Sequence, residues 1–147
     1  MSKGMSSNAR EMGICKQILA LDNSIRFAGM TNNAGNLFDA EYREGMSPLL
    51  TKEETELSAA TSIQRMETRK RLEIKLGKTL YALAQYEKVR RCTIPLSDNY
   101  STLLLVSFDN EADHESIMRE KIFPLLMKDG FNRKVNGKPV FQNLLSD

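Results

Sequence analysis

The apolar residues of the N-terminal third follow two different periods, and each period predicts a different element. From Met12 to Leu21 they recur at helical spacing, which predicts a helix over residues 9–21. Residues Ile25–Thr31 alternate between two faces, as a β-strand requires. The polar turn 32–35 contains Asn and Gly, which tolerate positive φ, and Asn36–Tyr42 then resumes as a strand. The pattern therefore predicts a helix followed by a β-hairpin.

A long helix is predicted next. Thr51 and Glu54 form a capping box, in which each side chain can satisfy a backbone N–H group of the other residue. Neither Pro nor Gly occurs from Thr51 to Leu76, and Gly77 can end the helix. We therefore expect one unbroken helix over Thr51–Leu76.

This predicted helix carries apolar residues on two nearly opposite sides. One side holds Ala59, Ile63, Met66 and Ile74, and the other holds Leu57, Leu72 and Leu76. A helix that covers one face of a sheet needs only one apolar stripe. The second stripe predicts a second packing partner, for which an adjacent helix is one candidate and a second subunit is the favoured one.

Three further strands are predicted after Gly77, over Thr79–Tyr86, Val89–Leu96 and Ser101–Phe108. The last of them has a continuous apolar centre, Leu103–Val106, which is typical of a strand that is buried on both faces. We therefore expect this strand to lie in the middle of the sheet.

A third helix is predicted to run to about Met127. Asp109 and Asn110 offer an N-cap, and acidic residues crowd the first turn, where the helix dipole favours them. Pro124 lies inside the helix and is expected to kink or fray its last turn.

The domain organisation follows from these elements. Residues 1–8 are small and polar, and we expect them to be disordered. We assign residues 9–128 to a single domain and residues 129–147 to a C-terminal tail, in which Asn136 and Gly137 favour a small hairpin.

The composition is that of an ordinary globular protein, with 147 residues, 41% hydrophobic residues, 27% charged residues and a net charge of +2. The bases are unevenly placed, because nine of them lie between Arg65 and Arg91 against three acids. We predict a basic patch for a partner at Lys70, Arg71, Arg90 and Arg91. The balanced net charge argues against binding to nucleic acid, which we keep as a minor alternative.

The sequence offers little chemistry. His114 is the only histidine. Together with Glu111 and Met118 it could form a weak metal site, but zinc usually requires several Cys or His ligands. The acidic first turn of a helix explains these residues better, because the helix dipole favours acids there. Cys15 and Cys92 fall in apolar stretches and are read as buried hydrophobic residues. Phosphate-binding glycine motifs and CxxC pairs are missing. We therefore predict a protein that is not an enzyme and has neither cofactor nor metal. The sequence shows no signal peptide or membrane helix, and we expect a cytoplasmic location.

The predicted order is helix, two strands, long helix, three strands, helix, which gives an α+β fold with a five-stranded antiparallel sheet. This order resembles the roadblock/longin group of profilin-like folds, and the resemblance implies the strand order 2-1-5-4-3. The stretches Ile25–Thr51, Leu76–Leu96 and Leu103–Glu115 are also similar to a set of small uncharacterised archaeal proteins. That second resemblance covers about residues 14–127 and implies no activity.

In roadblock proteins the long helix and the third strand commonly meet their copies in a homodimer. The resemblance therefore implies a homodimeric scaffold or regulator that binds another protein, with a small GTPase as the partner class suggested by analogy. We expect the dimer interface to contain Ile63, Met66, Arg69, Leu80 and Ala82. The alternative is a PAS-like small-molecule sensor with its ligand near Phe27, Leu37 and Tyr81, because PAS domains share the element order. PAS domains usually have several short helices after the second strand, and the long helix predicted here favours the roadblock reading.

Overall fold

The computed structural model describes residues 13–145. The predicted disordered segment 1–8 and the beginning of the first predicted helix lie outside the described residues. The rest of that helix is α2, Ile14–Leu19. The Asp39 carboxylate caps it by accepting hydrogen bonds from the backbone N–H groups of Gly13 and Cys15, at 2.9 and 3.3 Å.

The centre of the molecule is a five-stranded antiparallel sheet with the strand order β2-β1-β5-β4-β3. Its strands are β1 (Ile25–Thr31), β2 (Leu37–Tyr42), β3 (Ala82–Gln85), β4 (Val89–Pro95) and β5 (Leu103–Asp109). The predicted fold class and strand order are confirmed. Residues Leu103–Val106 of β5 are buried, as expected for the central strand.

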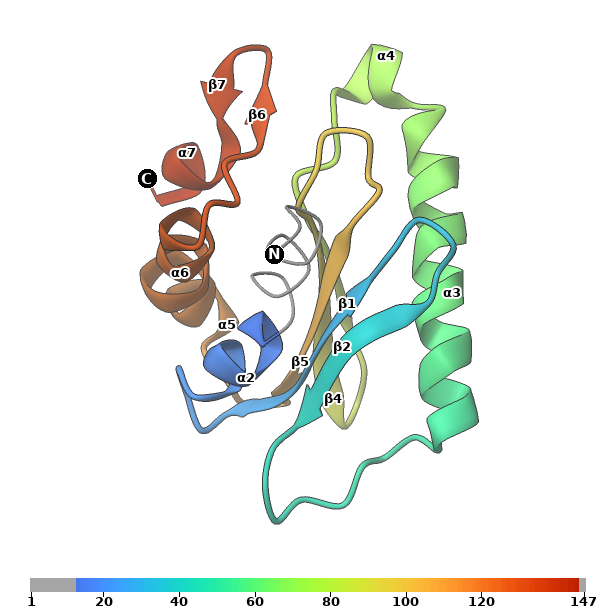
Figure 1. Ribbon diagram of the computed structural model, residues 1–147, viewed down its shortest axis with the longest axis vertical. Coiled ribbons are helices and arrows are strands. Elements are labelled where there is room, and N and C mark those ends of the chain that lie inside the picture. Colours follow the sequence, from blue (N-terminus) through green and yellow to red (C-terminus); the bar gives the residue numbers. More distant parts are fainter. Residues whose placement is uncertain (1–12, 146–147) are drawn as a thin grey trace, which may run out of the picture.

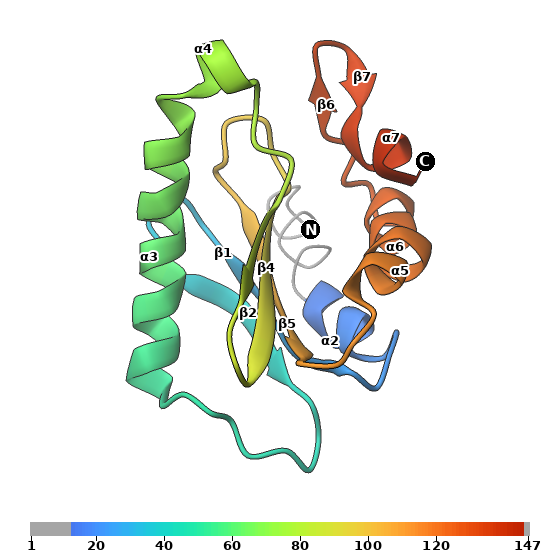
Figure 2. The same cartoon turned by 180° about the vertical axis from the view of Figure 1, so that it is seen from behind.

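Helices cover both faces of this sheet, which makes three layers (Figures 1 and 2). Helix α3, Lys52–Lys70, lies alone on one face. The other face is covered by α2 and by a C-terminal group of helices. This group consists of α5 (His114–Ile117), the π-helical turn η1 (Met118–Ile122), α6 (Phe123–Lys128) and α7 (Val140–Leu145).

The two faces have separate cores because alternate residues of a strand point to opposite sides. The core under α3 is the smaller one and contains Phe27, Ala59, Met66, Tyr100, Leu103 and Leu105. The larger core lies between the sheet and the other helices, and includes Ile18, Ile94, Phe108 and Leu126. Cys15 and Cys92 belong to this larger core, in agreement with the prediction that both are buried.

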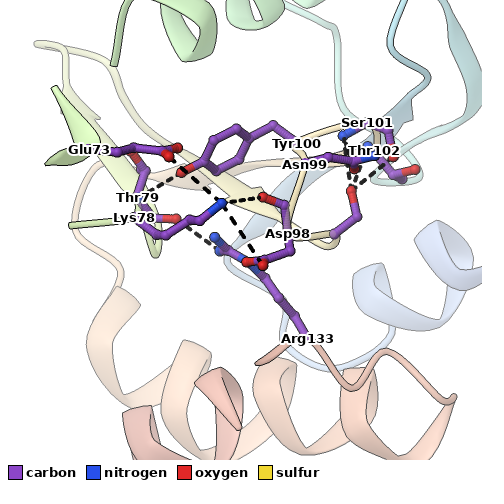
Figure 3. A network of polar contacts seen from close by, with 10 residues as sticks. Glu73, Lys78, Thr79, Asp98, Asn99, Tyr100, Ser101, Thr102 and Arg133 are labelled. Carbon is purple, nitrogen blue, oxygen red and sulfur yellow. Dashed lines mark hydrogen bonds and ion pairs between the residues drawn. The ribbon is translucent and has the colours of Figure 1, made fainter. Parts of the chain in front are cut away.

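The predicted long helix is broken near its end. The capping box of Thr51 and Glu54 is present, but α3 ends at Lys70 and a separate turn, α4, spans Glu73–Leu76. The sequence contains no Pro or Gly at the break. The Glu73 carboxylate of α4 lies 3.7 Å from Lys78 Nζ and faces the Tyr100 side chain (Figure 3). Ile74, which we placed on the buried side of one continuous helix, is 98% exposed.

The third predicted helix also differs in detail. Its N-cap is Asp113, whose side chain accepts a hydrogen bond from the Ser116 backbone N–H. Asp109 instead forms ion pairs with Arg26 and Arg43. Pro124 does not fray the last turn, because the chain widens into the π-helical turn η1 just before it and continues as α6. A proline has no N–H group and clashes with the carbonyl of residue i−4, and the wider turn accommodates both effects.

The C-terminal residues are part of the domain and not a separate tail. Lys134–Val135 and Lys138–Pro139 form the small hairpin β6–β7 that Asn136 and Gly137 predicted. Three apolar side chains of this segment, Phe131, Val140 and Phe141, are buried in the larger core. The rings of Phe141 and Phe123 stack with their centroids 5.4 Å apart.

Candidate interaction site

Strand β3 forms one edge of the sheet, and among the described strands it pairs with β4 alone. Residues Thr79–Tyr86, which contain β3, include no charged side chain. The opposite edge, β2, carries Asp39 and Glu41 and is followed by Arg43. Charged residues on an edge strand discourage pairing with another chain. The β3 edge is therefore the one that is suited to accept a further strand.

The flank of α3 beside this edge is apolar at its two ends and polar between them, and much of it is exposed. Leu57, Thr61, Arg65 and Thr68 follow one another at helical spacing along it, and Leu72 comes just after the end of α3. Leu57 is 68% exposed and Leu72 is 51% exposed. No residue of the described range 13–145 therefore covers the second apolar stripe seen in the sequence, although α4 no longer continues it as one helix.

The structure separates the five residues that we predicted for a dimer interface. Met66 is 1% exposed and lies in the core between α3 and the sheet, and Ile63 packs against the same core. Arg69 and Ala82 line one small cavity between α3 and β3. Leu80, at the start of the β3 segment, is 37% exposed. Three of the five residues therefore lie beside the open edge, and two face the interior of the subunit.

The predicted basic patch is not one surface. Arg90 and Arg91 are neighbours in β4, so their side chains point to opposite faces of the sheet. Arg91 Nη2 donates to the Ser58 hydroxyl of α3 at 2.7 Å, whereas Arg90 Nη1 donates to the Ala112 carbonyl at 2.7 Å and also contacts His114. Lys70 and Arg71 lie at the far end of α3.

A different group of bases does meet. Arg65 and Arg69 of α3 line a cavity of 60 Å³ together with Arg91 of β4. Sequence reasoning missed this cluster because it joins a helix to a strand. The spacing of Arg65 and Arg69 and the strand alternation at Arg91 were both visible, but only the packing of α3 on β4 brings them together.

Two larger grooves lie on the α3 side of the sheet. One, of 680 Å³, lies between α3, the loop 46–50 and the β3–β4 turn, and Phe27 is one of its lining residues. The other, of 700 Å³, lies between β2 and α3, and Leu37 is in its wall. Tyr81 is on the opposite face, where its ring lies 6.5 Å from that of Phe123. The three residues predicted for a PAS-like ligand site therefore do not share one cavity.

A polar network closes the other end of the sheet (Figure 3). The side chain of Arg133, which precedes β6, is fully buried, and its Nη1 donates to the Thr79 carbonyl at 2.8 Å. Its guanidinium lies 5.4 Å from the centroid of the Tyr100 ring. The Tyr100 hydroxyl accepts a hydrogen bond from the Thr79 backbone N–H at 3.0 Å, and burial raises the pKa of this hydroxyl. The network ties the C-terminal segment to the chain that leads into β3.

Other chemistry is sparse in the described part of the chain. No group of three His, Cys, Asp or Glu residues in it is placed to hold a metal ion. Burial lowers the pKa of His114, and the Arg90 charge lowers it further. Among residues 13–145, no helix is both long enough and apolar enough to cross a bilayer.

Comparison with solved structures identifies the fold. A Roadblock/LC7 domain from Streptomyces avermitilis superposes with a TM-score of 0.61, at 12% identity, over 78% of this chain and 90% of that chain. The chain has the roadblock/LC7 fold. An MglB protein in a tetrameric arrangement gives a TM-score of 0.67 at 12% identity, over 89% of this chain and 91% of that one. Myxococcus xanthus MglB gives a TM-score of 0.64 at 12% identity, over 95% of this chain and 93% of that one. Neither a family model nor a curated protein matches the sequence.

Proposed function

We propose that this roadblock-like chain is a non-enzymatic homodimer of the cytoplasm that serves as a scaffold or regulator for a protein partner. The observation that carries the proposal is the uncharged open edge of β3 beside the exposed flank of α3. Pairing of β3 with β3 of a second copy would satisfy the free backbone groups of both edges. The same contact would bring the two α3 flanks together and cover Leu57 and Leu72.

A second copy is the simplest occupant of this surface because the surface can be self-complementary. An edge strand pairs antiparallel with its own copy around a two-fold axis, and each subunit then contributes the same strand and helix flank. The tetrameric arrangement of one structural neighbour supports self-association in this fold. A partner protein would bind the surface that the dimer creates, and a small GTPase remains the partner class that the fold analogy suggests.

Sedimentation velocity tests the dimer. The wild-type chain should sediment at micromolar concentration with twice the 16.7 kDa mass of one subunit. Leu57→Lys and Ala84→Lys each place a charge on the proposed contact and should shift the protein to the monomer. Both residues are exposed in the subunit, so circular dichroism should show an unchanged fold.

The matched control is Ile74→Lys, which adds the same charge at a residue that is 98% exposed on α4. It should leave the dimer intact. A wild-type protein that is monomeric at micromolar concentration would refute the proposal. A Leu57→Lys variant that stays dimeric would refute the assigned interface. The partner is tested next, by co-elution of the dimer with a purified small GTPase of the same organism.

A further inference from the structure

We propose that the cavity formed by Arg65, Arg69 and Arg91, together with the adjoining groove, binds the carboxylate and the acyl chain of a fatty acid. The starting observation is that a basic cavity and a largely apolar groove share four lining residues. Ser58, Arg65, Tyr86 and Arg91 line both the 60 Å³ cavity and the 680 Å³ groove. A ligand that spans the two must therefore have an anionic end and an apolar end.

The small cavity has the chemistry of an anion site. Three arginines line it, and none of the described residues in its wall is acidic. Within residues 13–145, no carboxylate forms an ion pair with Arg65, Arg69 or Arg91. The Ser58 hydroxyl accepts one hydrogen bond from Arg91, at 2.7 Å. A guanidinium has five N–H donors in a planar fork that matches a carboxylate, so Arg91 keeps donors for a ligand.

The size of this cavity favours a small anionic group. Its 60 Å³ is several times the roughly 10–15 Å³ that one water molecule requires. A carboxylate fits such a space. The hydroxyls of Ser62 and Thr93 lie in the same wall, although Ser62 already donates to the Ala59 carbonyl at 2.6 Å.

The large groove has the chemistry of an acyl-chain site. Apolar side chains from the sheet, the loop before α3 and the β3–β4 turn line it, among them Phe27, Leu50, Tyr86 and Val89. Its 680 Å³ falls within the roughly 300–1,000 Å³ of typical small-molecule sites. The α3 side of the groove contributes both short side chains, Ser58 and Thr61, and the apolar Leu57.

The acidic residues of the large groove do not oppose this orientation. Glu54 and Glu87 line the groove, but neither lines the small cavity. The Glu54 carboxylate is held at the beginning of α3, where it accepts the Thr51 backbone N–H at 2.9 Å. Two further cations, Arg26 and Lys88, line the large groove, and Arg26 is paired with Asp109 at 3.1 Å. Three arginines converge only at the small cavity, so we place the carboxylate of the ligand there and its chain towards the loop 46–50.

Titration of the ¹⁵N-labelled full-length chain with dodecanoate, below its micelle concentration, tests the proposal. Amide signals of Ser58, Ser62 and Thr93 should shift and should saturate. Acetate, which lacks the chain, and 1-dodecanol, which lacks the charge, should each bind at least about tenfold more weakly, because each loses one half of the contacts.

Variants distinguish binding in the arginine cavity from an unspecific attraction to positive charge on the surface. Arg65→Gln removes one charged donor and should weaken dodecanoate binding about tenfold or more. Arg91→Gln should do the same, and Arg71→Gln, which changes an exposed residue outside both cavities, should bind as the wild type does. Equal affinity of all three variants would overturn the proposal, as would an absence of saturable shifts at Ser58.

The proposed ligand site and the proposed dimer contact share part of one surface, because Leu57 lines the groove and Ala84 lines the small cavity. The two tests still have separate readouts. Sedimentation reports on association, and the titration reports on the cavity. If acids of a second subunit fill the arginine cavity, dodecanoate will not bind to the wild-type dimer, and the proposal is overturned while the dimer stands.

Discussion

The turn between β1 and β2 touches α3 so closely that only glycine fits at its tip. Gly35 has φ +82°, and a Cβ added to it would lie 2.8 Å from the Ala60 Cα and 3.3 Å from the Ala60 Cβ. Gly35→Ala therefore combines two costs, a left-handed backbone that disfavours side chains and a clash with the backbone of a helix.

The two costs can be separated with a second glycine. A left-handed conformation costs an alanine about 1–2 kcal/mol, and overpacking at a contact that cannot rotate away costs about 1–3 kcal/mol more. Gly35→Ala should therefore lower the free energy of unfolding by about 2–5 kcal/mol. Gly45 has φ +75°, and nothing lies within 4 Å of an added Cβ. Gly45→Ala should therefore lower the free energy of unfolding only by the cost of the left-handed backbone, about 1–2 kcal/mol.

Urea unfolding followed by circular dichroism measures both variants. The protein concentration must be equal in all samples, because association adds to the apparent stability. The dependence of the unfolding free energy on urea should be unchanged, since the surface exposed on unfolding is the same. If Gly35→Ala and Gly45→Ala have equal unfolding free energies within about 0.5 kcal/mol, the inferred contact between the turn and α3 is absent.

Three further predictions concern buried and paired groups. Burial raises the pKa of the Cys92 thiol to about 12, and burial together with Asp39 raises that of Cys15, so neither thiol should react with a maleimide at pH 8 until urea unfolds the protein. Hydrogen bonds from Ser24 and Lys121 lower the Asp22 pKa from 3.8 to about 2, so this carboxylate stabilises the fold above pH 4 and loses that effect as the pH falls towards 2. Asp22→Asn should therefore cost about 1 kcal/mol at pH 6 and almost nothing at pH 2 in urea titrations at the two pH values. Arg133→Ala should lower the unfolding free energy by about 2 kcal/mol in the same assay, because it removes the bond to the Thr79 carbonyl and the contact with Tyr100.

Each of these predictions has a control and an opposing outcome. Rapid labelling of the native protein would show that a thiol is accessible. A cost of Asp22→Asn that is equal at both pH values would mean that its pKa is not lowered in the folded state. Lys134→Ala changes the exposed neighbour of Arg133 and should be nearly neutral. If Arg133→Ala and Lys134→Ala lower the unfolding free energy by the same amount, the buried network around Arg133 does not stabilise the C-terminal segment.

Local pattern was enough to predict the five strands and the central place of β5, although β3 is shorter than the predicted Thr79–Tyr86 and the strand order came from the fold resemblance. Strand alternation and the continuous apolar centre of β5 depend only on which side chains are buried on each face of the sheet. This pattern of burial can be recognised in a few consecutive residues. The capping box at Thr51 and the hairpin at Asn136–Gly137 were also predicted, because both rest on hydrogen bonds or backbone angles within four residues.

Features that depend on distant contacts were not predictable in this way. The helix was expected to continue to Leu76, but α3 ends at Lys70 and the separate turn α4 begins at Glu73. The residues at the break, Arg71 and Leu72, carry no local signal that ends a helix. The C-terminal segment looked like a tail, since the ring that Phe141 packs against is supplied by Phe123 of another helix.

The sequence by itself thus determined the order of the main helices and the five strands and the position of β5, but not α4, η1 or α7. The tertiary structure alone decided which apolar residues of α3 face the sheet, which edge of the sheet is left open, and that Arg65, Arg69 and Arg91 share a cavity. The physical reason is that a helix or a strand is specified by neighbours along the chain, whereas a binding surface is specified by neighbours in space.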